Sequence, residues 1–325
     1  MLGLNATYNA AVCAYLQAQT GTPVEITREV RLGGMAHDNW RLHVSGDLAA
    51  AAGTETFMLR AEVTPRIRAS TLDVADEFAL LRRLRDVGLE VPRALWLCED
   101  RTVIGRAFAL LDFAPGARDD SFGPERFARL VARIHGAAMS MRASNALPVA
   151  GAAQLVGELR AAAGRLHLFD PAYEVALRWL EQNLPRPVTG VLVHGDLHPA
   201  NIISSDGADV TLIDWDSACL ADPALEIGTL FSHMGTFGAG KWDTAAERAF
   251  LKAYETVMEV SIDSRAVLFW RIYAHVRQAL VRLAAAARRD AGPAGSLLGD
   301  LHGRLAAEEE LAFVTLIERA ETLED

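Results

Sequence analysis

The chain has 325 residues, of which 51% are hydrophobic, so it is long enough to bury a large core and to form two lobes. Its formal net charge of −10 at pH 7 argues against non-specific nucleic-acid binding, which depends on clustered Lys and Arg side chains. The same charge mildly favours a neutral or cationic small-molecule partner.

The first residues predict an amphipathic helix over residues 8–19, followed by strands. Two of these strands flank residues 31–40, which contain the pair Gly33-Gly34 and are typical of a turn. Paired glycines often serve turns that need a positive φ. A loop between two strands is therefore expected here.

The next strand carries a basic side chain into the predicted sheet. Residues 56–60 read Thr-Phe-Met-Leu-Arg, so this strand ends in Arg60. A helix is expected over residues 73–84, because apolar side chains recur at helical spacing there. The helix includes Glu77, an acidic residue whose simplest interpretation is a solvated helix face.

The rest of the chain is predicted to be two strands followed by mostly helix. Strands are expected over residues 94–100 and 105–113, and helices over residues 125–135, 154–183 and the segments after residue 228. Pro115-Gly116 ends the second strand and is expected to form a hinge. The order indicates an α+β fold.

The most specific pattern is a pair of short polar motifs joined by an apolar run. Residues 193–201 read Val-His-Gly-Asp-Leu-His-Pro-Ala-Asn, residues 210–213 read Val-Thr-Leu-Ile, and residues 214–216 read Asp-Trp-Asp. Phosphoryl transfer needs a carboxylate that orients and deprotonates the acceptor hydroxyl, and oxygen ligands for magnesium. The pattern predicts Asp196 as the base and Asn201 and Asp214 as metal ligands.

A second interpretation of the first motif stays open. His194, Asp196 and His198 form an H-x-D-x-H pattern that could ligate a transition metal in a hydrolase. Against it, the other histidines are scattered and no second histidine-rich motif follows. Asp206-Gly207, between two apolar runs, predicts a hairpin that connects the two motifs.

The two motifs, in this order and spacing, resemble the paired signature of the aminoglycoside phosphotransferase and choline kinase superfamily, small-molecule relatives of protein kinases. The resemblance covers about residues 24–228. It implies a two-lobed, protein-kinase-like fold. Residues 1–113 would form a nucleotide-binding lobe with an antiparallel sheet and one main helix, and residues 114–325 a larger, mostly helical catalytic and acceptor-binding lobe.

The resemblance also implies an activity and its residues. The γ-phosphoryl group of ATP would move to a hydroxyl of a small molecule with Mg²⁺ as cofactor, and GTP stays open as donor. Asp196 would be the base, and Asn201 and Asp214 would hold magnesium. Asp216 would be a further ligand or a supporting carboxylate, and His198 would shape the catalytic loop.

The resemblance places the nucleotide-binding residues in the first lobe and the hinge. They are Gly33 and Gly34 over the phosphates, Arg60 with its partner Glu77 at the α and β phosphates, and Asp112 and Ala114 at the adenine. The hinge would use main-chain groups, namely the carbonyl of Asp112 and the amide of Ala114.

Arg60 departs from the general kinase pattern, which has Lys at this point. Arginine is permanently charged and its planar fork suits phosphate and carboxylate, so the electrostatic role is retained. Some branches of the superfamily, including domains related to acyl-CoA dehydrogenases, carry Leu-Arg here. A catalytically weak nucleotide-binding regulator stays open as an alternative.

The remaining features indicate a cytoplasmic protein whose acceptor the sequence does not identify. Cys13, Cys98 and Cys219 are far apart and outside metal-ligand spacing, which is typical of reduced thiols. No apolar run of about 20 residues occurs, so no membrane span is expected. The acceptor candidates are an aminoglycoside, a macrolide, choline, a sugar, an amino alcohol and a hydroxyacyl thioester.

Overall fold

A computed structural model describes residues 6–33, 37–63, 71–118, 122–137, 147–205, 209–236, 241–287 and 293–322. Its contacts divide the chain into two compact units. The first unit comprises Met1–Arg66, Thr71–Ala117 and Ile203–Asp216, and the second comprises Ile67–Ser70, Arg118–Ile202 and Ser217–Asp325. The first unit is therefore discontinuous: the segment that ends in Asp214-Trp215-Asp216 packs with it, although the sequence interpretation assigned that segment to the second lobe.

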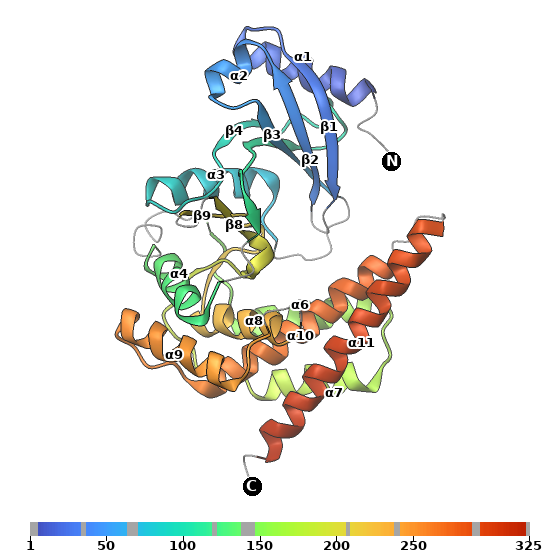
Figure 1. Cartoon of the computed structure of the whole chain (residues 1–325). Coiled ribbons are helices and arrows are strands. Elements are labelled where there is room, and N and C mark those ends of the chain that lie inside the picture. The colour runs from blue at the N-terminus through green and yellow to red at the C-terminus, as the bar shows by residue number, and fades with distance from the viewer. Residues whose placement is uncertain are drawn as a thin grey trace. The chain divides into compact units, whose positions relative to one another are not determined.

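The first unit is built on an antiparallel five-stranded sheet in the order β1-β2-β3-β5-β4 (Figure 1). Its strands are β1 (Glu25–Gly33), β2 (His37–Ser45), β3 (Thr56–Glu62), β4 (Ala94–Cys98) and β5 (Phe108–Asp112). Its helices are α1 (Ala6–Thr20), α2 (Asp47–Ala52) and α3 (Val74–Asp86).

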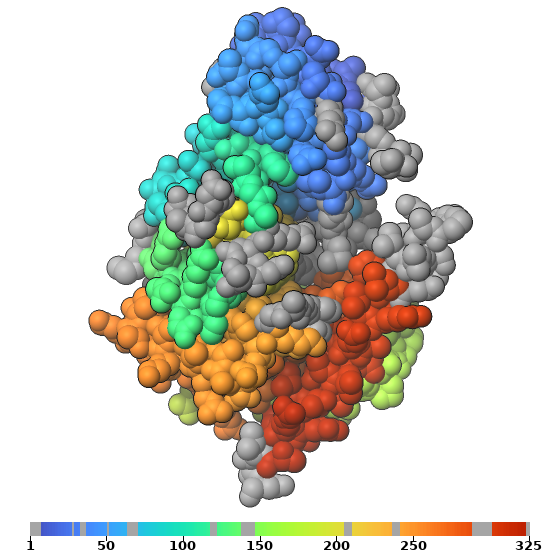
Figure 2. All heavy atoms as spheres, viewed as in Figure 1, coloured from blue at the N-terminus to red at the C-terminus, as the bar shows by residue number. Residues whose placement is uncertain are grey.

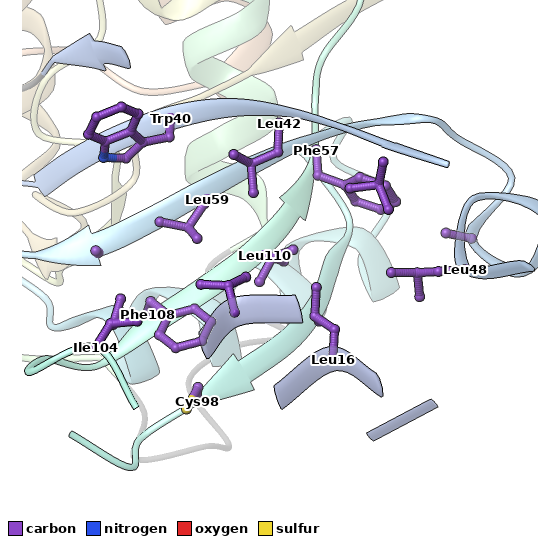
Figure 3. Packing of buried hydrophobic residues seen from close by; sticks show 14 residues of the cluster. Leu16, Trp40, Leu42, Leu48, Phe57, Leu59, Cys98, Ile104, Phe108 and Leu110 are labelled. Carbon is purple, nitrogen blue, oxygen red and sulfur yellow. The ribbon is translucent and has the colours of Figure 1, made fainter. Parts of the chain in front are cut away.

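The alternation of side chains along β3 separates the core of this unit from its polar site. Phe57 and Leu59 are fully buried and point into a cluster that includes Phe108 and Leu110 of β5 and Leu16 of α1 (Figure 3). Successive side chains of a strand point to opposite faces. The side chain of Arg60 therefore projects from the face of the sheet opposite to that of Leu59.

Helix α3 begins where Asp73 accepts a hydrogen bond from the amide of Asp76 at 2.8 Å, which satisfies one of the free N–H groups of the first turn. Leu80, Leu81 and Leu84 form its buried side. Glu77 is also buried, with only 3% of its surface exposed. It is thus not the solvated helix-face residue of the simplest interpretation, and an ionised group in this position requires a partner.

Two short strands precede the Asp-Trp-Asp motif. A three-stranded sheet has the order β6-β8-β9, with β6 at Ala117–Arg118, β8 at Ile202–Ser205 and β9 at Asp209–Leu212. The turn predicted at Asp206-Gly207 lies outside the described residues. The pairing of β8 with β9 agrees with the expected hairpin.

The second unit is mostly helical. Its helices are α4 (Pro124–Gly136), α6 (Ala152–Arg165), α7 (Pro171–Gln182), α8 (Pro223–Thr236), α9 (Thr244–Met258), α10 (Ser264–Ala287) and α11 (Pro293–Thr322), and its short elements are β7 (Val191–Val193), η1 (Pro199–Asn201) and β10 (Cys219–Ala221). β7 pairs with β10 in an antiparallel ladder. Residues 301–322 of α11 are visible on one face of this unit (Figure 2).

The helix expected over residues 154–183 is in fact two helices, α6 and α7. The chain turns between them at His167, whose φ of 50° is left-handed. Asp170 then caps α7 by accepting a hydrogen bond from the amide of Ala172, and Pro171 occupies the first turn. Proline tolerates the start of a helix but not its interior, so the break was encoded locally.

None of the helices in the described ranges is long and apolar enough to cross a membrane.

Candidate active site

The first unit holds a buried cluster of opposite charges centred on Arg60. Nε of Arg60 donates to Oε2 of Glu77 at 2.6 Å, and Nη2 donates to Oδ1 of Asp214 at 2.6 Å. A carboxylate oxygen of Asp216 lies 3.9 Å from Nη2. The structure thus contains the expected pairing of Arg60 with Glu77, and it adds Asp214 as a second partner.

Glu77 also holds the main chain of the Asp-Trp-Asp motif. Its Oε1 accepts the amide of Trp215 at 3.2 Å, and the indole of Trp215 is fully buried. Asp214 itself has a φ of 67°, a left-handed conformation that Asp adopts more readily than most residues. Its side chain is 40% exposed. The motif therefore presents the Asp214 carboxylate outward while its neighbours anchor the turn.

The charge of Arg60 is stable in this setting. Burial alone would lower its pKa, but the attraction of Glu77, Asp214 and Asp216 outweighs burial and raises the pKa above the ordinary value. A guanidinium can satisfy two carboxylates because its donors point in different directions within one plane. Arg60 therefore links α3 to the Asp-Trp-Asp motif.

The second unit holds the His-Gly-Asp motif in a tight loop after β7. Gly195 has a φ of 80°, and a Cβ added there would lie 2.4 Å from the carbonyl oxygen of Ser217. Only glycine fits such a close approach of two main-chain segments. The fully buried carboxylate of Glu226 accepts the amides of His194 and Gly195. The side chain of Glu226 on α8 thus fixes the main chain of this loop.

Asp196 lies among three basic side chains, and we name Asp196, His198, His233 and Arg277 the Asp196 cluster. Nη2 of Arg277 lies 3.2 Å from Oδ1 of Asp196, and Nε2 of His233 lies 3.5 Å from the same oxygen. Nε2 of His198 lies 3.8 Å from Oδ2. Burial alone would raise the pKa of Asp196, but His233, Arg277 and His198 favour the charged form and hold the pKa well below its usual range.

Asn201 is tied to the same loop. Its Nδ2 donates to the main-chain carbonyl of Asp196 at 2.8 Å, so the amide group turns its Oδ1 away from that bond. Within the described residues, Oδ1 accepts no hydrogen bond. An amide oxygen held in this way suits a hard cation.

The geometry opposes the alternative of a transition-metal site. Asp196, His198 and His233 place ligand atoms within 4.8 Å of one another. The third member of this group is therefore His233 and not His194, which the sequence pattern suggested. A metal-bound histidine donates its second ring N–H to an acceptor, but Nδ1 of His198 faces the amide N–H of Ala200 at 3.2 Å. The guanidinium of Arg277 also competes with a cation for Asp196.

The remaining nucleotide-binding candidates are less fully described. Gly33 is the last residue of β1, and Gly34 lies outside the described residues. The Asp112 side chain accepts from the amide and Nε of Arg93. Ala114, two residues beyond β5, makes no amide hydrogen bond to the described protein. The roles of these residues stay predictions.

Two residues of the site, His233 and Arg277, were missed in the sequence, whereas Glu226 lies in a segment that resembles the family's support of the catalytic loop. Glu226 lies in the segment 222–228, Asp-Pro-Ala-Leu-Glu-Ile-Gly, whose Asp-Pro start marks a helix beginning. His233 and Arg277 lie within ordinary helical patterns of α8 and α10, far from Asp196 in sequence. Their spacing carries no local signal, so only the packing of these helices brings them to the loop.

Comparison with known proteins identifies the family of the chain. A family model described as "Phosphotransferase enzyme family" matches residues 32–260. The chain is similar to acyl-CoA dehydrogenase family member 10 from Mus musculus, with 28% identity over 190 residues, which are 53% of this chain and 18% of that protein. It is similar to a homoserine kinase from Gluconacetobacter diazotrophicus, with 28% identity over 216 residues, 62% of this chain and 66% of that enzyme.

In each case the chain spans less than two thirds of the relative's length. Among solved structures, a choline kinase from Streptococcus pneumoniae superposes with a TM-score of 0.63 at 15% identity, covering 93% of this chain and 98% of that chain. At this identity the likeness concerns the fold.

Proposed function

Because this chain belongs to the phosphotransferase enzyme family, we propose that it transfers the γ-phosphoryl group of ATP to a hydroxyl group of a small molecule. Asp196 orients the hydroxyl and accepts its proton. Asn201 and Asp214 hold magnesium. Arg60, fixed by Glu77, contacts the α and β phosphates, and Gly33, Gly34, Asp112 and Ala114 complete the nucleotide site.

One observation carries this proposal: the two expected metal ligands, Asn201 and Asp214, lie at the start and the end of the same strand pair, β8 and β9. Asn201 directly precedes β8, and Asp214 is the second residue after β9. Each side chain is held by its own unit, Asn201 by the carbonyl of Asp196 and Asp214 by Arg60. The order of base, amide, strand pair and carboxylate supports phosphoryl transfer over other chemistries.

The donor set fits magnesium. Mg²⁺ prefers hard oxygen ligands, and Asn201 and Asp214 offer an amide oxygen and a carboxylate. Asp216 is mostly buried and lies 3.6 Å from Nδ1 of His37, so it serves as a supporting carboxylate. When bound, the ion would neutralise charge on the phosphates of the nucleotide.

The reaction balances with the groups present in the chain. The acceptor O–H bond breaks as a new P–O bond forms, and the bond between the γ-phosphorus and the oxygen of ADP breaks. The proton passes to the Asp196 carboxylate and then to water. Because the pKa of Asp196 is low, Asp196 is a weak base that acts mainly by orienting the hydroxyl, as a loose transition state allows.

The test is acceptor-dependent ADP formation from Mg-ATP. The panel comprises L-homoserine, choline, ethanolamine, an aminoglycoside, a macrolide, simple sugars and hydroxyacyl thioesters. At least one acceptor should increase ADP release and gain a phosphate by mass spectrometry. ATP binding without transfer to any acceptor would favour the regulator, and nucleotide-independent phosphate release would favour the hydrolase.

A further inference from the structure

The two carboxylate oxygens of Asp196 have different surroundings. Oδ1 faces two nitrogen atoms, Nη2 of Arg277 at 3.2 Å and Nε2 of His233 at 3.5 Å. Oδ2 faces Nε2 of His198 at 3.8 Å, which is beyond hydrogen-bond distance. In the described part of the chain, Oδ2 therefore has no direct donor. The Asp196 side chain is 28% exposed, so an acceptor can reach it.

Arg277 fixes both the main chain and the side chain of the loop. Its Nη1 donates to the carbonyl of Gly195 at 2.8 Å, while Nη2 reaches Oδ1 of Asp196. The side chain is only 8% exposed, so packing within α10 and its neighbours holds the guanidinium in place. Two bonds from one planar group define the rotation of the Asp196 carboxylate more closely than a single bond could.

His233 adds a second contact to the same oxygen. Its ring lies against that of His198, with centroids 4.6 Å apart, and Nε2 of Gln278 lies 3.2 Å from its Nδ1 and 2.9 Å from its Nε2. A half-turn of the Gln278 carboxamide exchanges its donor and acceptor groups, so its oxygen can face a hydrogen on Nε2 of His233. A carboxylate oxygen can only accept a hydrogen bond. The ring nitrogen that faces Oδ1 must therefore carry a hydrogen for the contact to be favourable.

We propose that Arg277 and His233 are positioning residues of the transfer reaction: they occupy Oδ1 of Asp196 and leave Oδ2 as the oxygen that receives the acceptor hydroxyl. The inference rests on the proposed function, because it assigns Asp196 as the base. It goes further by naming which oxygen takes the proton. It also assigns a role to α8 and α10, whose residues have no place in the sequence motifs.

This arrangement explains how a weakly basic carboxylate can still act as the base of the transfer reaction. When Arg277 and His233 donate hydrogen bonds to Oδ1, the carboxylate cannot rotate freely. The lone pairs of Oδ2 then stay oriented toward the acceptor hydroxyl. Orientation of this kind lowers the barrier without a strong base. Removal of either donor should therefore reduce turnover while the nucleotide site, which lies on other residues, keeps its affinity.

The first measurement uses the full chain with ¹⁵N-labelled histidine and does not depend on an acceptor. Long-range ¹H–¹⁵N spectra at pH 8 report which ring nitrogen carries the hydrogen, and the His233→Gln variant assigns the signal. The proposal predicts a hydrogen on Nε2 of His233. A hydrogen on Nδ1 alone would overturn the contact between His233 and Oδ1.

The second measurement compares turnover of substituted enzymes with the acceptor found by ADP formation. Arg277→Gln should lower kcat on the order of 10²-fold, the usual effect of a misplaced reacting group, with the KM for ATP unchanged within about twofold. Arg277→Lys keeps the charge and should recover part of the loss. His233→Leu should lower kcat roughly tenfold, and His233→Gln, which keeps an N–H donor, should lose less.

Arg271→Gln is the matched control, because Arg271 also lies on α10 but pairs with Glu247 at 2.9 Å. It should keep kcat near the wild-type value. Losses in Arg277 variants no larger than in this control, or a rise in KM for ATP without a change in kcat, would overturn the positioning role. A wild-type enzyme that phosphorylates no acceptor would instead overturn the proposed function, so the two failures are distinct.

Discussion

Nη2 of Arg60 lies 2.6 Å from Oδ1 of Asp214, and the same guanidinium binds Glu77 through Nε. The basic residue of the proposed phosphate site thus also holds the proposed metal-binding carboxylate. A lysine ammonium is a single charged point and could not bind both partners in this planar arrangement. The arginine at this position is consequently more than a substitute for the usual charge.

Arg60→Lys should therefore impair the enzyme although the charge is retained. We expect a higher apparent KM for ATP and slower turnover, with Arg60→Ala more severe and Glu77→Gln weaker. Arg101→Lys is the control, since Arg101 lies in the same unit, outside the proposed nucleotide site, with a side chain that is 60% exposed. Steady-state kinetics with varied Mg-ATP measures the effect. Unchanged ATP kinetics in Arg60→Lys, Arg60→Ala and Glu77→Gln would mean that β3 and α3 do not form the phosphate site.

Asp214→Ala should abolish transfer and weaken magnesium-dependent nucleotide binding, because a hard cation loses a charged oxygen ligand. Asn201→Ala should act in the same direction less severely, since a neutral amide contributes less. Asp100→Asn, in an exposed turn, serves as the control. Calorimetric titration of ATP with and without magnesium gives the result. Near-native turnover of Asp214→Ala at low magnesium would contradict the ligand assignment.

Gly195→Ala should disrupt the catalytic loop. The new Cβ would lie 2.4 Å from the Ser217 carbonyl oxygen, and a φ of 80° is unfavourable for alanine. We expect loss of transfer and a lower melting temperature. Gly157→Ala is a matched control in the middle of α6 with open space around the new Cβ, and this variant should be more stable than the wild type by about 0.5–1 kcal/mol. A Gly195→Ala protein with native activity would show that the loop does not require this close approach.

His135 should make stability depend on pH. Its Nδ1 lies 2.8 Å from the Tyr254 hydroxyl, and burial lowers the pKa of His135 to about 3. The unfolded chain, with a histidine pKa near 6.5, binds the proton more tightly, so stability is full above about pH 6.5 and falls as the pH drops toward 3. When the pH is lowered from 7 to 5, this residue should reduce the free energy of unfolding by about 2 kcal/mol.

Urea unfolding of the wild type and of His135→Gln at both pH values tests this. The wild type should lose about 2 kcal/mol more than the variant over this interval. Equal losses would mean that His135 is protonated in the folded protein or is accessible to water.

Local patterns were sufficient to predict much of the first unit. The pattern of residues 56–60 placed Arg60 on a strand, and the helical spacing around Glu77 placed that carboxylate on a helix. The face of the sheet from which Arg60 projects became clear only in the structure. Their pairing followed from a resemblance and is present in the structure. The turn at His167 was missed because an Ala- and Leu-rich run dominates the pattern, although Asp170-Pro171 is a typical helix start.

The surroundings of Asp196 could not be predicted in the same way. Arg277 and His233 come from two helices, and their side chains meet the loop only through packing of α8 against α10. One cause is Gly228, where an added Cβ would lie 2.6 Å from the main-chain nitrogen of Arg271. A glycine inside a helix signals such a close approach in hindsight, but it does not identify the partner.

The central claim is tested most directly on Asp196→Asn, which keeps the size of the side chain and removes its charge. Mg-ATP affinity and the melting temperature should stay near the wild-type values, while acceptor-dependent ADP formation should fall on the order of 10²- to 10⁴-fold. All three quantities are measured on this one variant. Retained transfer with intact ATP binding would contradict the role of Asp196 as the base.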